Sequence, residues 1–148
     1  MRIEEYFSED SVMFLNSVNK EEVLSAMVIQ AEKLGYLSRK DEFKEALLER
    51  ELIMSTDIGW KVAIPHAKLK SISKFFVIPA ILKNDLDWGG GNNQSVNIVL
   101  LIGGPENEQT TYLQILSKVT LIVRNNQRRQ ALLAATIAEE VIAQFTGL

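Results

Sequence analysis

The sequence contains no cysteine and a single histidine among its 148 residues. Without cysteine there is no disulfide, no thiolate metal ligand and no thiol nucleophile, and a reducing cytoplasm is the compartment that fits such a chain most easily. One histidine is too few for a zinc site of the His-rich kind. We therefore expect a cytoplasmic protein that uses neither a metal ion nor another cofactor.

Long hydrophobic runs and an excess of positive charge are absent too. No run is long enough to cross a bilayer, and the acidic first residues, Met1–Tyr6, lack the apolar core of a secretory signal, so we expect no membrane insertion. The formal net charge of −3 disfavours nucleic acid as a partner, because phosphates favour a basic surface. Hydrophobic residues make up 47% and charged residues 24% of the chain, which is typical of one globular domain, residues 1–148.

Helical periodicity occupies both ends of the sequence. Asn19 is a predicted N-cap, with Glu22 three residues on, for an amphipathic helix that ends near Gly35. A second helix is predicted from Ser38 to about residues 49–51. After residues 103–105 the helical spacing returns in a long segment, a short helix at 128–135 and a last helix with a capping box at 136–139.

Three apolar runs between these helical segments are predicted strands, at residues 62–64, 75–82 and 96–102. The last run is almost continuously apolar, as expected for a central strand covered on both faces. Pro79 interrupts the middle run and, because it has no N–H, indicates an edge position or a bulge. We expect one α/β domain in which helices flank a sheet.

A phosphate-binding loop and a serine hydrolase site are two alternatives that the motifs disfavour. The glycine-rich segment 87–93 has neither the G-x-G-x-x-G spacing nor the G-K-[ST] ending that bring backbone amides and a lysine onto a nucleotide. Its place between two predicted strands favours an ordinary turn. The chain also has no G-x-S-x-G elbow for a nucleophilic serine.

The single histidine, His66, directly follows Pro65 at the end of a predicted strand. Proline tends to end a strand, and strand ends in α/β sheets are where ligand sites gather. A neutral imidazole can attack with one nitrogen while a hydrogen bond holds the other, and so can accept a group covalently. The alternative is a histidine that is simply hydrogen-bonded at a strand end.

Cations and hydroxyl groups near His66 in the sequence favour the catalytic interpretation, because they would suit a phosphoryl group. For Arg50, which ends the second predicted helix, the alternative is a cation that compensates the helix C-terminus. The other residues of this kind are Ser55, Thr56, Lys61 and Lys68.

The segment from Arg50 to Ala67, RELIMSTDIGWKVAIPHA, resembles the enzyme IIA domains, mannitol/fructose type, of the bacterial phosphoenolpyruvate-dependent sugar phosphotransferase system. The family pattern is roughly R-E … S-T-x-I-G-x-G-[IV]-A-[IV]-P-H-[AG]. The resemblance extends over the whole chain and implies a mixed β-sheet flanked by helices on both faces. It also implies a phosphotransferase component that takes phosphate from the carrier protein HPr onto His66, beside Arg50, and passes it to an enzyme IIB for sugar uptake.

Tyr112 departs from the family pattern, because many members carry a second histidine at this place. A tyrosine hydroxyl donates a hydrogen bond to a phosphate oxygen but supplies no positive charge at pH 7. Phosphoryl transfer relies on positioning and charge stabilisation, so the loss of a cation favours slower transfer. The alternative function is therefore a regulatory or interaction domain with weak or no phosphotransfer, and a scaffold without chemistry is a third, less favoured one.

Two further sets of residues complete the predicted site. The candidates for contact with the phosphate oxygens, besides Arg50, are Ser55, Thr56 and Tyr112. The candidates for a shallow apolar rim that docks both protein partners are Ile58, Trp60, Lys61 and Ile64, of which Trp60 and Lys61 stand where the family usually has a small pair ending in glycine.

Overall fold

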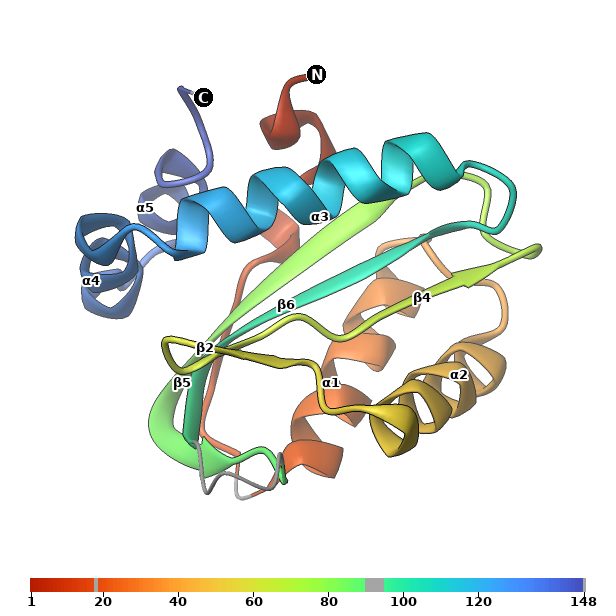
Figure 1. The fold of residues 1–148 in the computed structure, drawn as a ribbon, viewed down its shortest axis with the longest axis horizontal. Coiled ribbons are helices and arrows are strands. Elements are labelled where there is room, and N and C mark those ends of the chain that lie inside the picture. Colours follow the sequence, from red (N-terminus) through yellow and green to blue (C-terminus); the bar gives the residue numbers. More distant parts are fainter. Residues whose placement is uncertain (18, 90–94, 148) are drawn as a thin grey trace.

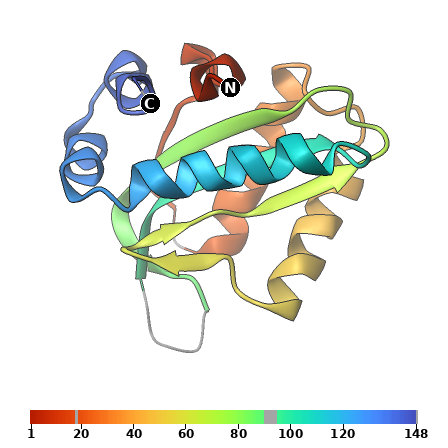
Figure 2. The ribbon, with the colours of Figure 1, turned by 45° about the horizontal axis from the view of Figure 1, so that its top comes forward.

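A computed structural model describes residues 1–17, 19–89 and 95–147 of the chain. A single β-sheet separates two helical layers (Figures 1 and 2). One face is covered by α1 (Lys20–Lys33) and α2 (Lys40–Ile53). The other face carries α3 (Gln109–Val123), α4 (Asn126–Ala134) and α5 (Ala138–Ala143), together with the 3-10 helices η1 (Ile3–Tyr6) and η2 (Glu9–Ser11). None of the described helices has the length and apolar character needed to span a membrane.

The sheet of the described residues is mixed, which confirms the predicted fold class. Its strands follow the order β1-β5-β6-β3-β2, and β4 also pairs with β6. The central pair β5 and β6 is antiparallel, whereas β3 and β4 run parallel to β6, one after the other along the same side. The bounds are β1 Met13–Leu15, β2 Asp57–Gly59, β3 Val62–Ala63, β4 His66–Leu69, β5 Phe76–Asp87 and β6 Ser95–Pro105.

Side chains of the two central strands alternate between two hydrophobic cores. In β6, Leu100 and Ile102 enter the core beneath α3, whereas Val99 and Leu101 enter the core beneath α1 and α2. Both faces of β6 are therefore buried, which explains its continuous apolar sequence and confirms that it is a central strand.

The first helix begins and ends where its sequence predicts. The Asn19 side chain accepts a hydrogen bond from the Glu22 amide at 2.9 Å, and Gly35 takes a φ of 83° just after the helix. Helix α2 begins at Lys40, two residues later than predicted, and continues to Ile53. At α5 the capping carboxylate belongs to Glu140, which accepts from the Thr136 amide at 2.9 Å, so the predicted box is displaced by one residue.

Pro79 lies in an inner strand, so the prediction of an edge strand or a bulge at this position is wrong. The irregularity of the β5–β6 ladder falls later, between Ile81 and Leu86. Proline is tolerated because the short strand β1 first pairs with β5 at Ala80, which leaves that flank of Pro79 without a ladder partner. The predicted glycine-rich turn at 87–93 lies mostly outside the described residues, which resume at Ser95.

Candidate functional site

A break between β3 and β4 places His66 and fixes its tautomer. The Ile64 amide donates to the Thr56 carbonyl at 3.0 Å, and the Ile64 carbonyl lies 2.6 Å from Nδ1 of His66. Because a carbonyl oxygen only accepts hydrogen bonds, Nδ1 carries the proton of the neutral ring. The lone pair of the imidazole is therefore on Nε2, and the strand pairing of His66 with Ile102 holds the backbone on which the ring is mounted.

The His66 ring is neutral at pH 7. Burial lowers the pKa of His66 below its usual 6.5. The hydrogen bond that His66 donates to the Ile64 carbonyl acts in the opposite direction, and the positive charge of Arg50 lowers the pKa further. The side chain is only partly buried. The residue thus combines an unprotonated nitrogen with access from solvent, which is the state required of a nucleophile.

Arg50 lies in the last turn of α2, and its guanidinium reaches the C-cap residue of the same helix. Its Nη1 donates to the Met54 carbonyl at 2.8 Å. The positive charge of Arg50 lowers the pKa of both His66 and Tyr112. Within residues 1–17, 19–89 and 95–147, Arg50 forms no ion pair. The arginine therefore keeps donors and a charge for an anion.

Tyr112 is buried in the first turns of α3, beside the histidine. Its ring centroid is 5.7 Å from that of His66 and 6.2 Å from that of Phe75, and Nζ of Lys68 lies 4.6 Å from the centre of the tyrosine ring. Burial raises the pKa of Tyr112 to about 12, against the opposing effect of Arg50. The hydroxyl therefore keeps its proton throughout the physiological range and is a donor.

Thr56 belongs to a buried network around the Glu51 carboxylate. The side chain of Glu51 is 4% exposed and accepts from both the amide and the hydroxyl of Thr56, and from Nε1 of Trp88 at 3.3 Å. Nζ of Lys20 pairs with the same carboxylate at 3.4 Å. The hydroxyl of Thr56 is thus engaged with Glu51, and contact of Thr56 with a phosphate oxygen stays a prediction. Sequence reasoning did not identify this network, which ties α1, α2 and the end of β5 together.

Ser55 is half-buried at the start of the turn that leads to β2. Its Oγ accepts from the Asp57 amide at 3.2 Å. The hydroxyl proton of Ser55 has no acceptor among the described residues, which leaves it available to an anion. Ser55 therefore fits a phosphate-contacting role better than its neighbour Thr56.

The predicted docking rim is not one surface. Ile64 is 3% exposed and packs in the core beneath α3, so its side chain cannot touch a partner; its carbonyl holds His66 instead. Ile58 is partly buried against the same core. Trp60 is half-exposed, with the Arg129 guanidinium 5.7 Å from its ring centre, and Lys61 pairs with Asp85 at 2.6 Å.

The turn formed by Trp60 and Lys61 lies away from the histidine. Both residues have positive φ values, 56° and 61°, as in a tight two-residue hairpin. The ladder places Val62 opposite Ile98 and His66 opposite Ile102, a separation of roughly 13 Å along β6. Trp60 and Lys61 therefore lie outside the group formed by His66, Arg50 and Tyr112.

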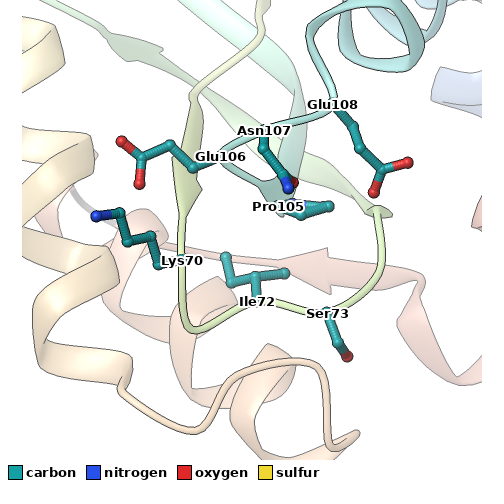
Figure 3. Close-up of a pocket in the computed structure, with 7 residues that line it drawn as sticks. All are labelled: Lys70, Ile72, Ser73, Pro105, Glu106, Asn107 and Glu108. Carbon is teal, nitrogen blue, oxygen red and sulfur yellow. The ribbon is translucent and has the colours of Figure 1, made fainter.

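A cavity of about 630 Å³ lies beyond the ends of β4 and β6 (Figure 3). Lys70 and Ile72 line it from one side and Pro105 and Glu106 from the other. His66 is not among the lining residues, so this cavity is separate from the histidine site.

The fold and this site define a class of protein, an α/β domain with a partly buried, neutral histidine at the start of a strand and with an arginine and a tyrosine nearby. The family described as "Phosphoenolpyruvate-dependent sugar phosphotransferase system, EIIA 2" matches residues 5–147. The chain belongs to this family, the enzyme IIA domains of the mannitol/fructose type.

Similar proteins include both sugar-transport and regulatory components. The chain is 31% identical over 143 residues to the PTS system fructose-specific EIIABC component of Bacillus subtilis, covering 96% of this chain and 22% of that protein. It is 28% identical over 142 residues to the Nitrogen regulatory protein of Bradyrhizobium diazoefficiens, covering 95% of this chain and 92% of that protein.

Solved structures give the same picture of the fold. The crystal structure of Nitrogen Regulatory Protein IIA-Ntr from Neisseria meningitidis matches with a TM-score of 0.88 at 25% identity, covering 97% of this chain and 99% of that chain. The chain thus spans nearly the whole length of the nitrogen regulatory proteins, but only 22% of the fructose-specific relative.

Proposed function

We propose that this protein is a phosphoryl carrier, which accepts a phosphoryl group on Nε2 of His66 from phospho-HPr and passes it to an enzyme IIB for sugar uptake. The observation that carries the proposal is the hydrogen bond between Nδ1 of His66 and the Ile64 carbonyl, because it leaves Nε2 as the unprotonated nitrogen. Membership of the enzyme IIA family supports the assignment.

In the first step, the Nε2 lone pair attacks the phosphorus atom of the donor phosphohistidine in line. A P–N bond forms to His66 while the P–N bond of the donor breaks, and the donor imidazole leaves with the electron pair. The proton of His66 stays on Nδ1, and its hydrogen bond to the Ile64 carbonyl stabilises the positive charge that develops on the ring.

Three groups from different elements would hold the phosphoryl oxygens. Arg50 supplies the positive charge, and the protonated hydroxyl of Tyr112 supplies a hydrogen bond from α3. Ser55 supplies another hydroxyl. Because phosphoryl transfer depends mainly on positioning and charge, no metal ion or nucleotide is required in this mechanism.

In the second step, a cysteine or histidine of an enzyme IIB attacks the phosphohistidine and returns Nε2 to its starting state. The name of the fructose-specific EIIABC relative joins A, B and C components in one system, which supports an enzyme IIB as the acceptor. The sugar is not specified by the side chains around His66.

Incubation with phosphoenolpyruvate, enzyme I and HPr tests the proposal. We expect one acid-labile phosphoryl group on the wild-type protein and none on His66→Ala, whose fold should be retained because the side chain is only partly buried. An established enzyme IIA serves as the positive control. If that control is labelled and the wild-type protein is not, the carrier function is wrong, and the regulatory alternative without phosphotransfer takes its place.

A further inference from the structure

Three consecutive apolar side chains project into solvent at the end of α2. Leu52, Ile53 and Met54 are 87%, 81% and 67% exposed. Every other exposed large hydrophobic residue in the described part of the chain is 53% exposed or less, and these residues are scattered singly along the sequence. Contiguous exposed apolar side chains mark interaction sites, whereas single ones need no explanation. We call Leu52, Ile53 and Met54 the apolar loop.

The apolar loop is attached to the proposed active site by its own backbone. The Met54 carbonyl accepts from Nη1 of Arg50 at 2.8 Å, and the Met54 amide donates to the Arg50 carbonyl at 3.3 Å. A protein that covers the loop therefore also lies close to the Arg50 guanidinium, whose positive charge lowers the pKa of His66.

Buried contacts on both sides keep the loop in place. Glu51 precedes it and Thr56 follows it soon after, and the carboxylate of the former accepts from the amide and hydroxyl of the latter. Leu52 and Ile53 are the last two residues of α2 and Met54 is its C-cap, so the helix and the contacts between Glu51 and Thr56 hold these residues in place. An ordered apolar surface loses little conformational entropy on binding, which favours its use in recognition.

The charges beside the loop indicate what kind of partner fits. Arg50 donates to the Met54 carbonyl of the loop itself, and Nζ of Lys68 lies 4.6 Å from the centre of the Tyr112 ring beside His66, so two cations lie near the loop and the histidine. The nearest buried carboxylate, Glu51, is already paired with Lys20. An apolar surface next to unpaired positive charge complements a protein with an apolar contact face around an anionic group.

We propose that the apolar loop is the docking surface for the protein that brings the phosphoryl group to His66. This inference rests on the proposed function. The phosphoryl anion of the donor would meet Arg50 while apolar side chains around it cover Leu52, Ile53 and Met54. Three side chains provide far less than the roughly 800 Å² per partner of a stable complex, so the surface suits a carrier that must dissociate after each transfer.

The test compares two phosphoryl donors on the triple variant Leu52→Ser/Ile53→Ser/Met54→Ser. With phospho-HPr, we expect KM for HPr to rise tenfold or more while kcat changes less than about twofold, because only binding of the partner is impaired. With phosphoramidate, a small donor that needs no docking surface, the variant and wild type should be labelled at equal rates.

Matched controls lie on other helices. Ile29→Ser on α1 and Leu121→Ser on α3 remove apolar side chains that are 50% and 51% exposed, and both should leave KM unchanged. Ile53→Ser alone should give an intermediate rise in KM, and it keeps the test valid if the triple variant fails to fold.

An unchanged KM in a folded triple variant would overturn the docking role. Equal loss of labelling with both donors would also overturn it, because the loop would then act through Arg50 rather than through docking. A concentration-dependent dimer in sedimentation velocity that the triple variant loses would assign the loop to a second copy of this chain instead. If the wild-type protein is labelled by neither donor, the proposed carrier function is wrong. This outcome differs from those that overturn the docking role alone, so the two hypotheses are tested separately.

Discussion

Nδ1 of His66 donates a hydrogen bond to the carbonyl oxygen of Ile64, two residues earlier in the chain, with 2.6 Å between the nitrogen and the oxygen. The side chain of Ile64 is anchored in the core beneath α3, so the acceptor cannot easily move. The unprotonated nitrogen, Nε2, is therefore selected by a backbone group next to a strand end, and a second side chain is not needed for this purpose.

The first prediction concerns the pH dependence of transfer. Burial, and to a lesser extent Arg50, lowers the pKa of His66 below 6.5 in spite of the Ile64 carbonyl. The rate of labelling should therefore be flat above pH 6.5 and fall only as the pH drops through the lowered pKa, where the ring becomes protonated. Stopped-flow transfer from phospho-HPr measures this profile, and a midpoint above 6.5 would contradict it.

The same shift makes a second, independent prediction about stability. Below pH 6.5 the histidine of the unfolded chain takes up its proton before that of the folded protein, so the unfolded state binds more protons. The contribution of His66 to stability is complete above pH 6.5 and is lost as the pH falls through the folded pKa. Urea unfolding measures the free energy of unfolding at each pH. Between pH 7 and pH 5 this free energy should fall more steeply with decreasing pH for wild type than for His66→Gln. Parallel pH dependences of the two proteins would show that the pKa of His66 is not lowered.

Much of the scaffold can be predicted from the sequence because its signals are local. The Asn19 cap and Gly35 fix α1 within a few residues of the chain, and the apolar run of β6 identifies a strand buried on both faces. Pro65 predicts the break that follows β3, although the sequence does not predict that His66 begins a further strand, β4. In each case the information lies within one element.

What the sequence did not predict depends on contacts between distant segments. In the Glu51 network, Glu51 and Trp88 are 37 positions apart in the sequence, and no local pattern indicates that they form a pair. From sequence alone, an apolar residue next to a site can belong either to an exposed docking surface or to the hydrophobic core. The prediction that Ile64 contacts a partner is wrong, because its side chain is buried in the core. Strand β1 has three residues, too few for a periodic signal, and without it the environment of Pro79 cannot be known.

Substitutions at Tyr112 can separate two contributions to phosphoryl transfer, the positive charge near the phosphoryl group and the hydrogen bond that positions it. Tyr112→Phe removes only the hydroxyl and should reduce kcat roughly tenfold to a hundredfold, the effect of one hydrogen bond to a charged group. Tyr112→His should keep or raise the wild-type rate, because an imidazole can also donate to the phosphoryl group and can carry charge. Single-turnover labelling measures both variants, and a Tyr112→His protein slower than wild type would contradict this view.

Glu51 should matter for stability and for His66 together. Glu51→Gln leaves Lys20 without its partner and presents an amide to three donors, which should cost about 2–4 kcal/mol in the free energy of unfolding. The Glu51 carboxylate also raises the pKa of His66, so its loss should lower that pKa further in an NMR titration. Glu49→Gln, an exposed carboxylate on the same helix, is the matched control and should change stability by less than about 0.5 kcal/mol. Equal stability of the two variants would contradict a structural role for the network.

Gly104 gives a prediction that links packing in the core to the site. A Cβ at this position would lie 2.0 Å from Cδ1 of Phe75, whose ring stacks on Tyr112. Gly104→Ala should therefore push Phe75 toward Tyr112, destabilise the protein by about 1–3 kcal/mol and slow transfer. Added to Phe75→Ala, which removes the clashing side-chain atoms, the same substitution should cost less than about 1 kcal/mol, because the two residues are coupled. Chemical denaturation of the four proteins in this cycle measures the coupling, and additive losses would show that Phe75 does not transmit the strain.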